Sequence, residues 1–340
     1  MTHTIPRVPK TGLRRTDPAR LRNTVRLELT GQVPPHPPTA DHLNQVREWN
    51  GDTNNDFGTC GPCAVANSVI LTWLYLLGEV ITVSDSAIFD LYRRSGNPTF
   101  DPNARPGPDG SVPGDNGVDM TVMLAELVRN GIDITHASGT TERVRPLAFA
   151  SAPAVIDGVR AITSIFGGAL LAVTLQTAQQ TQTATGVWDY ALSPEWGGHA
   201  VEGGAYQSLA GAGQIDETII SWQRPVGTTD QFLDHQLDEV YVVVWQPLWD
   251  HPAFQQGVDR AALAADYTAS TGRPFPVPAP APVPPPLPVP DPGTVWVDSA
   301  DQALWAGLPP DWVTDRHTGK NRIAAGLVAA WWKIKNQGGA

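Results

Sequence analysis

The chain has very little cysteine and no long apolar run. Only 2 of its 340 residues are cysteines, too few for the disulfide framework of a small secreted domain, so its stability must come from packing. The longest apolar candidate, residues 65–77, is interrupted by Asn67, Ser68 and Thr72. It is shorter than the stretch of about 20 residues that crosses a bilayer. We therefore expect no membrane partner.

Net positive charge and an export signal are also lacking. The formal net charge is −11, which argues against nucleic-acid binding by the main domain. The N-terminus has no apolar signal-peptide core, so we expect a cytoplasmic or virion-associated location. Basic residues gather in the first 26 positions, and this arm either lies on an acidic partner surface or forms a solvated tail. They are Arg7, Lys10, Arg14, Arg15, Arg20, Arg22 and Arg26.

Composition divides the chain into five regions. Residues 1–45 form a basic, proline-containing arm, and residues 46–250 carry the periodicities of a folded domain. With 41% hydrophobic residues the chain can bury a core. A connecting segment, 251–273, leads to a polyproline stretch at 274–293, expected to be an extended spacer because proline fixes φ and lacks an amide donor. Residues 294–340 are predicted to form a small helical docking module.

The order of the periodic patterns predicts an α+β fold for the main domain. Pro62 suits a first helical turn, and the apolar pattern continues almost all round to Leu77, so this helix should be central and buried. Helical patterns come first and strand patterns later, which predicts a helical half packed on an antiparallel β-sheet. Further helices are expected from Ser84, over 118–129 and over 153–165, and strands over 169–175, 199–206, 218–222 and 240–245.

The two cysteines stand together in the tetrad CGPC at 60–63. Three interpretations are open: two small side chains packed in a core, the dithiol of a CGPC oxidoreductase, or one nucleophilic thiolate at the start of a helix. A thioredoxin-like dithiol should follow a hydrophobic strand, whereas the preceding residues 49–56 form a polar loop. This loop disfavours the oxidoreductase.

A nucleophilic cysteine needs a base and a lowered pKa. The dipole and free amides of a helix start are expected to lower the pKa of a thiol at Cys60 or Cys63. Of 8 histidines, His199 stands out, because it begins a predicted strand after two glycines in WGGHAV, residues 196–201. Its separation from Cys60 along the chain falls in the window typical of Cys–His hydrolases.

These motifs resemble those of the papain-like cysteine peptidases. The likeness covers about 54–244, through NNDFGTCGPCA at 54–64, GGHAV at 197–201, IISWQ at 219–223 and DEVYVVV at 238–244. It is similar in particular to a divergent papain-like group found in actinobacterial phages. The resemblance implies a papain-like fold and a Cys–His dyad that cleaves a peptide or amide bond in a peptide or protein substrate, with no cofactor and no metal.

The resemblance also chooses between the cysteines. In these relatives an amide side chain six residues before the nucleophile donates to the oxyanion. Asn54 stands six residues before Cys60, whereas Phe57 stands six before Cys63. The resemblance therefore implies Cys60 as the nucleophile, His199 as the base and Asn54 as an oxyanion donor, beside the N–H of Cys60 itself.

One position departs from the family pattern. Papain-like enzymes carry an Asn before Ser-Trp to orient the His, and this chain has Ile220 there. Asp216, Ser221 and Gln223 are the weak candidates to replace it, and Trp222 either shields the His from water or packs in the core. A dyad without an orienting group works less efficiently.

This gap keeps a second function open. In this second interpretation, the chain is a virion or surface structural protein that uses a catalytically weakened papain-like domain as a platform. The basic arm at 1–45 and the module at 294–340 would attach it to a capsid or another virion shell.

Overall fold

The computed structural model describes residues 10–27, 29, 36–51, 53–107, 111–208 and 214–277. The chain divides into two compact units, Met1–Pro278 and Ala279–Ala340. The predicted docking module at 294–340 and the spacer from residue 278 onward lie outside the described residues, and both stay predictions.

The central helix, α3 (Cys60–Leu77), follows from its apolar sequence. Its residues from Cys60 to Trp73 are buried, so apolar side chains on every face contact other elements. Gly78 ends the helix in the left-handed region at φ 63°, which glycine adopts without strain. Within the described part of the chain, α3 is the one helix long and apolar enough to cross a membrane. Yet 78% of its apolar window is buried inside the protein, as in a core helix.

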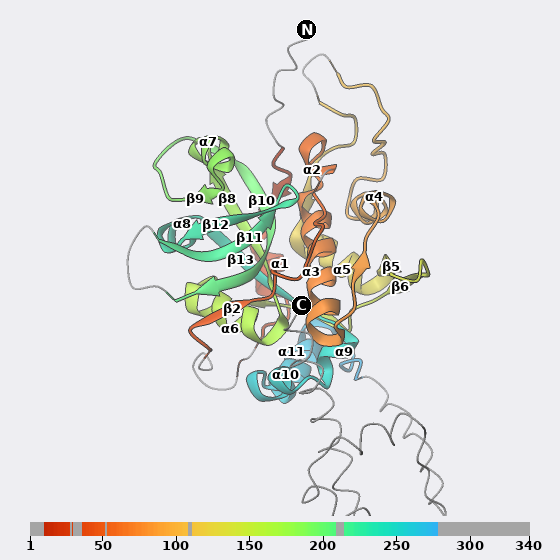
Figure 1. Ribbon diagram of the computed structural model, residues 1–340. Helices are drawn as coiled ribbons and strands as arrows, with labels where there is room; N and C mark the ends of the chain where they lie inside the picture. The colour runs from red at the N-terminus through yellow and green to blue at the C-terminus, as the bar shows by residue number, and fades with distance from the viewer. Residues whose placement is uncertain are drawn as a thin grey trace, which may run out of the picture. The chain divides into compact units, whose positions relative to one another are not determined.

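Smaller elements complete a helical half around α3 (Figure 1). They are α2 (Thr53–Asp56), α4 (Asp85–Arg94), α5 (Met120–Asn130), β3 (Ile81–Thr82), β5 (Ile132–His136) and β6 (Thr141–Val144). The three strands form a small sheet in the order β3-β5-β6. Ser84 caps α4 by accepting a hydrogen bond from the Ala87 N–H. The apolar faces of α4 and α5 pack on α3 in one buried cluster, so these elements hold the start of α3 rigidly.

A large sheet forms the other half. Its path is β7 (Ala148–Ala152), β13 (Leu237–Val244), β8 (Ala169–Gln176), β10 (Glu195–Gln207), β11 (Ile215–Ser221), β12 (Arg224–Thr229) and β9 (Val187–Trp188). Neighbours along this path are antiparallel except β12 and β9. Three short strands attach beside it: β1 (Leu13–Arg14), β2 (Thr39–Asp41) and β4 (Val118–Asp119). The predicted α+β architecture is therefore confirmed.

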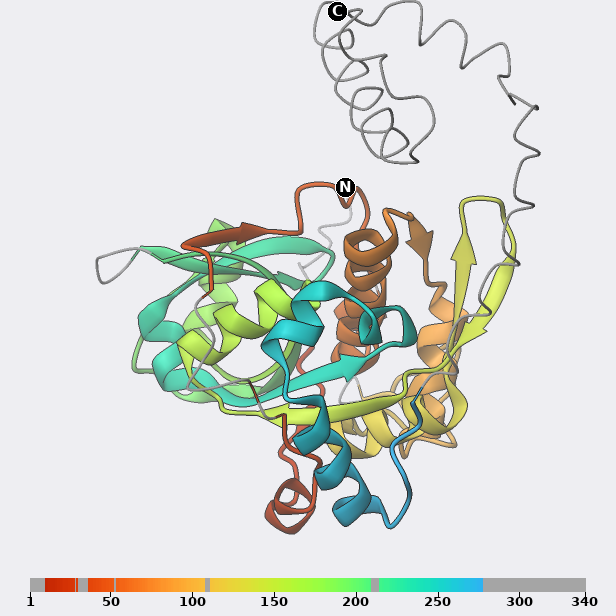
Figure 2. The same ribbon diagram turned by 90° about the horizontal axis from the view of Figure 1, so that it is seen from below.

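Helices pack on the sheet and supply part of a second buried cluster. They are α6 (Ile156–Phe166), α8 (Asp230–Gln236), α9 (Gln246–Trp249), α10 (Pro252–Gly257) and α11 (Arg260–Thr271). The polar helix α7 (Thr177–Thr185) lies beside β8 and β9, and α1 (Pro18–Arg22) lies in the N-terminal segment. Figure 1 shows α9, α10 and α11 together below α3, and Figure 2 shows them from that side.

Both flanking segments differ from the sequence expectation. The arm predicted at 1–45 packs on the body in its described part, where Val25 and Leu27 are buried. The connecting segment predicted at 251–273 contains α10 and α11, whose Phe254 and Leu263 are completely buried. The folded body therefore extends beyond 46–250 at both ends, because apolar residues of both flanks complete its core.

Candidate active site

Cys60 is the first residue of α3, and it is almost completely enclosed. Only 1% of the residue is exposed, and its thiol is free. Burial raises the pKa of the Cys60 thiol to about 11, although the backbone N–H groups of Ala200, Gly12 and Gly61 stabilise the thiolate. The expected lowering of this pKa is therefore wrong for this structure. A helix dipole contributes about 0.3–1 kcal/mol, and the lost solvation of the thiolate outweighs it.

Cys63 lies one turn further along α3 and is enclosed by hydroxyl groups. Its Sγ lies 3.2 Å from Thr53 Oγ1 and 3.9 Å from Thr59 Oγ1. Burial raises the pKa of the Cys63 thiol to about 12. Since both thiols are buried and free, neither presents its sulfur to an outside disulfide, and the dithiol oxidoreductase gains no support.

His199 lies on β10 in a fully buried aromatic enclosure. Its ring stacks on Trp222 with 4.4 Å between centroids and 22° between planes, and Trp188 meets it edge-on at 6.1 Å. Nε2 forms a 2.8 Å hydrogen bond with Ser221 Oγ. Burial lowers the pKa of the His199 imidazole to about 3, so the ring is neutral. Trp222 therefore shields the ring and also packs in the core.

Strand pairing explains why Ser221 reaches His199. In the ladder between β10 and β11, Glu202 pairs with Ile220. Paired residues of antiparallel strands share a sheet face, and successive residues alternate. Ile220 therefore lies on the face of Glu202, and Ser221 on the face of His199. The family pattern has its orienting residue at position 220, whereas the side chain that bonds to the His199 ring is one residue later.

The turn after β11 has an unusual backbone. Trp222 and Gln223 have φ values of 44° and 64°, the left-handed region that non-glycine residues seldom adopt. Two such central residues match a type I′ hairpin turn between β11 and β12. The turn holds the Trp222 ring against His199.

The two other candidate orienting residues lie elsewhere. Asp216 forms a bidentate ion pair with Arg160, at 2.6 Å from one guanidinium nitrogen to each carboxylate oxygen. Gln223 is exposed in the hairpin turn and lines a surface hollow with Trp49 and Asn50. Of the three candidates, Ser221 is the one that bonds to the His199 ring.

Asn54 lies in α2, just before the loop that leads into α3. It is buried, and its Oδ1 has no hydrogen-bond partner among the described residues. The Asn54 N–H donates to the Gly51 carbonyl at 3.0 Å, which fixes the backbone of α2. A buried amide is therefore held in place six residues before Cys60.

Cys60 lies where the start of α3 packs beside Ala200, the residue that follows His199 on β10. Ala200 belongs to the same buried cluster as Cys60, and its backbone N–H is among the groups that counteract the raised pKa of the Cys60 thiol. In the described part of the chain nothing hydrogen-bonds to His199 Nδ1. Cys60 is thus next to the β10 strand that carries His199, and both the thiol and the imidazole are neutral. No sequence pattern marks the amides of Ala200 and Gly12, since any residue supplies a backbone N–H.

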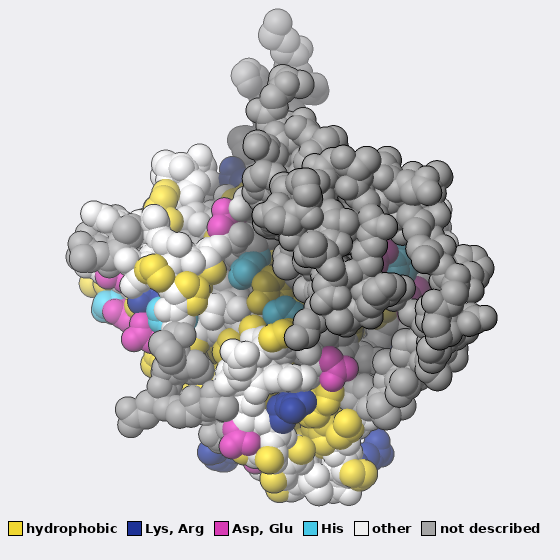
Figure 3. Space-filling model, turned by 60° about the horizontal axis from the view of Figure 1, so that its bottom comes forward, with side chains coloured by type: hydrophobic (Ala, Val, Ile, Leu, Met, Phe, Trp, Pro, Cys, Tyr) yellow, Lys and Arg dark blue, Asp and Glu magenta, His cyan; other side chains and the backbone are white. Residues whose placement is uncertain are grey.

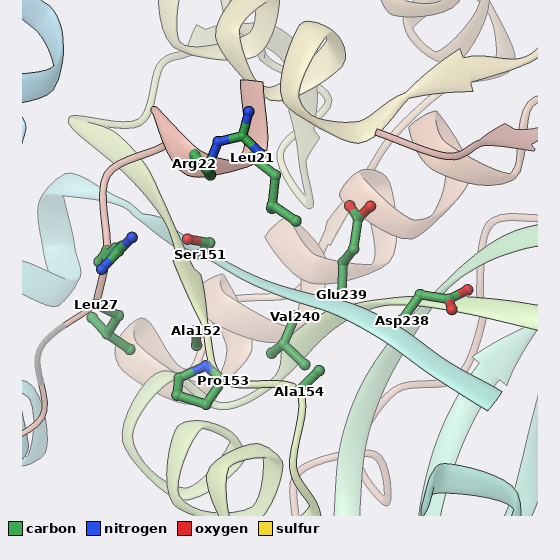
Figure 4. Close-up of a pocket in the computed structure, with 11 residues that line it drawn as sticks. Leu21, Arg22, Leu27, Ser151, Ala152, Pro153, Ala154, Asp238, Glu239 and Val240 are labelled. Atoms are coloured by element: carbon green, nitrogen blue, oxygen red, sulfur yellow. The ribbon is translucent and has the colours of Figure 1, made fainter. Parts of the chain in front are cut away.

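The surface hollow beside α1, β7 and β13 contains neither Cys60 nor His199. Figure 4 shows this hollow with the carboxylates of Asp238 and Glu239 at its edge. On the described surface visible in Figure 3, charged side chains of both signs are scattered among apolar ones. The described ranges hold no group of three His, Cys, Asp or Glu residues suited to a metal ion.

Known structures share this architecture, although no protein-family model and no curated protein match the sequence. Xylellain, a cysteine protease from Xylella fastidiosa, aligns with a TM-score of 0.51 and 11% identity, over 72% of this chain and 99% of that one. Procathepsin B S9 from Trypanosoma congolense aligns with a TM-score of 0.50 and 11% identity, over 69% of this chain and 86% of that one. The chain has the papain-like α+β fold.

Proposed function

We propose that the protein is a papain-like thiol hydrolase that cleaves a peptide or amide bond through Cys60 and His199. One observation carries the proposal. In a papain-like fold, a buried thiol at the start of α3 packs beside the residue that follows His199, whose Nε2 is held by Ser221 and whose Nδ1 has no partner among the described residues. This combination provides a nucleophile with an oriented base.

The hydrogen bond to Ser221 accommodates the useful tautomer. When the Nε2–H of His199 donates to Ser221 Oγ, Nδ1 carries a lone pair that can take the thiol proton of Cys60. Because both groups are neutral in this structure, the proton moves as the sulfur attacks, rather than resting in a preformed ion pair.

The remaining steps follow from the same groups. The Cys60 sulfur bonds to the substrate carbonyl carbon, and the oxyanion accepts hydrogen bonds from the Cys60 N–H and the Asn54 amide. His199 then gives its proton to the departing amine as the C–N bond breaks. Water hydrolyses the thioester and releases the acid, which restores the thiol.

Labelling with the epoxide E-64 tests this proposal. We expect the adduct to map to Cys60, and His199→Ala to slow labelling by about 100-fold or more, the usual contribution of a general base. Cys63→Ala is the matched control, because it removes a buried thiol of the same helix without touching the dyad, and it should label like the wild type. Labelling that is indifferent to His199→Ala would refute the dyad.

One observation favours a second candidate, a binding platform in a virion or on a cell surface. The chain's own N-terminal segment packs against Gly58, two residues before Cys60, and the Gly12 N–H is among the groups that stabilise the Cys60 thiolate. A platform needs no turnover, so Cys60 should then react with E-64 no faster than with a simple alkylating agent. The actinobacterial phage kinship and a capsid partner belong to this candidate.

A further inference from the structure

A short extended segment bridges the two halves of the domain above Cys60. Leu13 in β1 pairs antiparallel with Gly198 of β10 along one edge, and in parallel with Val118 of β4 along the other. Figure 1 shows this red strand between the sheet half and the helical half. One strand of the chain therefore pairs with β10 of the sheet half on one side and with β4, which precedes α5, on the other, and these two strands are the walls of its passage.

Glycines line this passage where the backbones approach. A Cβ on Gly12 would lie 2.3 Å from the Cα of Gly58, and one on Gly117 would lie 2.2 Å from the Gly12 carbonyl oxygen. A Cβ on Gly198 would lie 2.5 Å from the carbonyl oxygen of Leu13. Contacts this short exclude any side chain. The walls thus form a groove for a main chain with glycine opposite Cys60.

The segment rests in the groove as an occupant, not as a substrate. Gly12 packs against Gly58, two residues before Cys60, and its backbone N–H is among the groups that stabilise the Cys60 thiolate. The Gly12 carbonyl oxygen accepts a 2.8 Å hydrogen bond from the Val118 N–H on the helical wall. That carbonyl is therefore directed at the wall and away from the Cys60 N–H, which the reaction needs as oxyanion donor.

Carboxylates hold the segment on either side of Gly12. Lys10 Nζ lies 3.4 Å from Asp115 Oδ2, and only 5% of the Asp115 side chain is exposed. Asp115 Oδ1 accepts from the Gly58 N–H at 2.9 Å, which fixes the carboxylate at the groove. Beyond the strand, Thr16 Oγ1 donates to Glu239 at 2.8 Å. The groove thus offers a negative charge to a basic residue two positions before the glycine.

We propose that this groove selects extended peptides with a glycine facing Cys60 and a basic residue two positions earlier. Residues 10–14 are its resident ligand, which an outside peptide must displace. The substrate class rests on the proposed hydrolase function. The groove's ligand preference can be measured without turnover.

The first experiment uses Gly12→Val in the full chain, since the added branches collide with Gly58 and displace the segment. Alkylation of Cys60 by iodoacetamide should become at least about tenfold faster, which corresponds to about 1.4 kcal/mol of lost protection. Ala19→Val is the control, because it adds the same kind of bulk at an exposed position of the same arm, and it should react like the wild type.

A second variant guards against misfolding of the first. Thr16→Val keeps the shape of the side chain and removes the hydroxyl hydrogen bond to Glu239. It should accelerate alkylation of Cys60 by a smaller factor, with unchanged circular dichroism. If both variants keep the fold and react like the wild type, the segment does not cover Cys60 and the inference is wrong.

Peptides then test the selectivity. The synthetic peptide VPKTGLRR, residues 8–15, should restore protection of Cys60 in Gly12→Val. The same peptide with valine for glycine, or glutamate for lysine, should protect at least about tenfold less well. Equal protection by all three peptides would overturn the selectivity.

Repeating the series in a His199→Ala background separates the two proposals. Protection there depends on the groove alone, because the base is gone. Suppose that the peptide still protects Cys60 in this background, and that His199→Ala does not change the rate of E-64 labelling. The groove preference is then supported and the hydrolase proposal fails. If E-64 labelling depends on His199 and no peptide protects, the hydrolase proposal stands and the groove preference fails.

Discussion

Replacing Ser221 by alanine tests the orienting group most directly. The substitution removes the one hydroxyl that bonds to His199 Nε2 and leaves that nitrogen in a completely buried enclosure. The ring is completely buried beside Trp222 and Trp188, so bulk water does not reach the nitrogen that loses its partner. The imidazole then lacks the partner that accommodates the tautomer in which Nδ1 is the base.

The magnitude follows from the burial. An unpaired polar group inside a protein costs about 1–3 kcal/mol, and each 1.36 kcal/mol is a factor of ten, so the E-64 labelling rate of Cys60 should fall by about 5- to 150-fold. The Ser221→Thr variant keeps the hydroxyl and should recover most of the rate.

The control is the neighbouring residue. Ile220 lies on the other face of β11 in a cluster with Leu43 and Leu71, so Ile220→Val should cost about 0.5–1.5 kcal/mol of stability and leave labelling unchanged. Stopped labelling reactions analysed by mass spectrometry, with thermal unfolding in parallel, give both quantities. A Ser221→Ala rate equal to the wild type, or a rate that falls only in proportion to stability, would refute the orienting role.

Three further predictions concern charge. Asp216→Asn should destabilise the fold by about 3 kcal/mol in urea unfolding, because it leaves Arg160 without its buried carboxylate, and it should not change E-64 labelling. Burial raises the pKa of Glu202 well above 4.5, so the folded state keeps a proton that the unfolded chain releases. Stability should therefore fall as pH rises above about 4.5, and Glu202→Gln should weaken that fall between pH 5 and pH 8. Finally, with the pKa of Cys60 at about 11, alkylation of Cys60 in the wild type should rise about tenfold per pH unit between pH 7 and pH 9. A plateau across that range would indicate a preformed ion pair.

The helices and strands that the sequence predicts correctly are those with a pronounced hydrophobic pattern of their own. The apolar run after Pro62 and the four predicted strands agree with α3, β8, β10, β11 and β13. The helix predicted over 118–129 begins instead with a strand residue, Val118, because it pairs with Leu13 from the arm. Such a long-range pairing leaves no periodic pattern in either segment.

The candidate site was harder to predict for two physical reasons. The side chain that bonds to His199 depends on strand register, which an irregularity between Gly203 and Ala205 helps to set. The pKa of Cys60 depends on burial, and the arm that contributes to that burial has the basic, polar composition of a solvated tail. Neither the strand register nor the burial of Cys60 can be predicted from the residues of the local motif alone.

Backbone strain in the turn can be relieved at Gln223 without affecting the site, whereas relieving it at Trp222 would remove the ring that covers His199. Each residue carries the cost of a left-handed backbone, of order 1–3 kcal/mol, which glycine would relieve. Gln223→Gly is then a stabilising substitution available to protein engineering, since its side chain is exposed. Trp222→Gly relieves similar strain but uncovers the His199 ring. Natural variation in this hairpin should therefore be free at the second turn residue and restricted at the first.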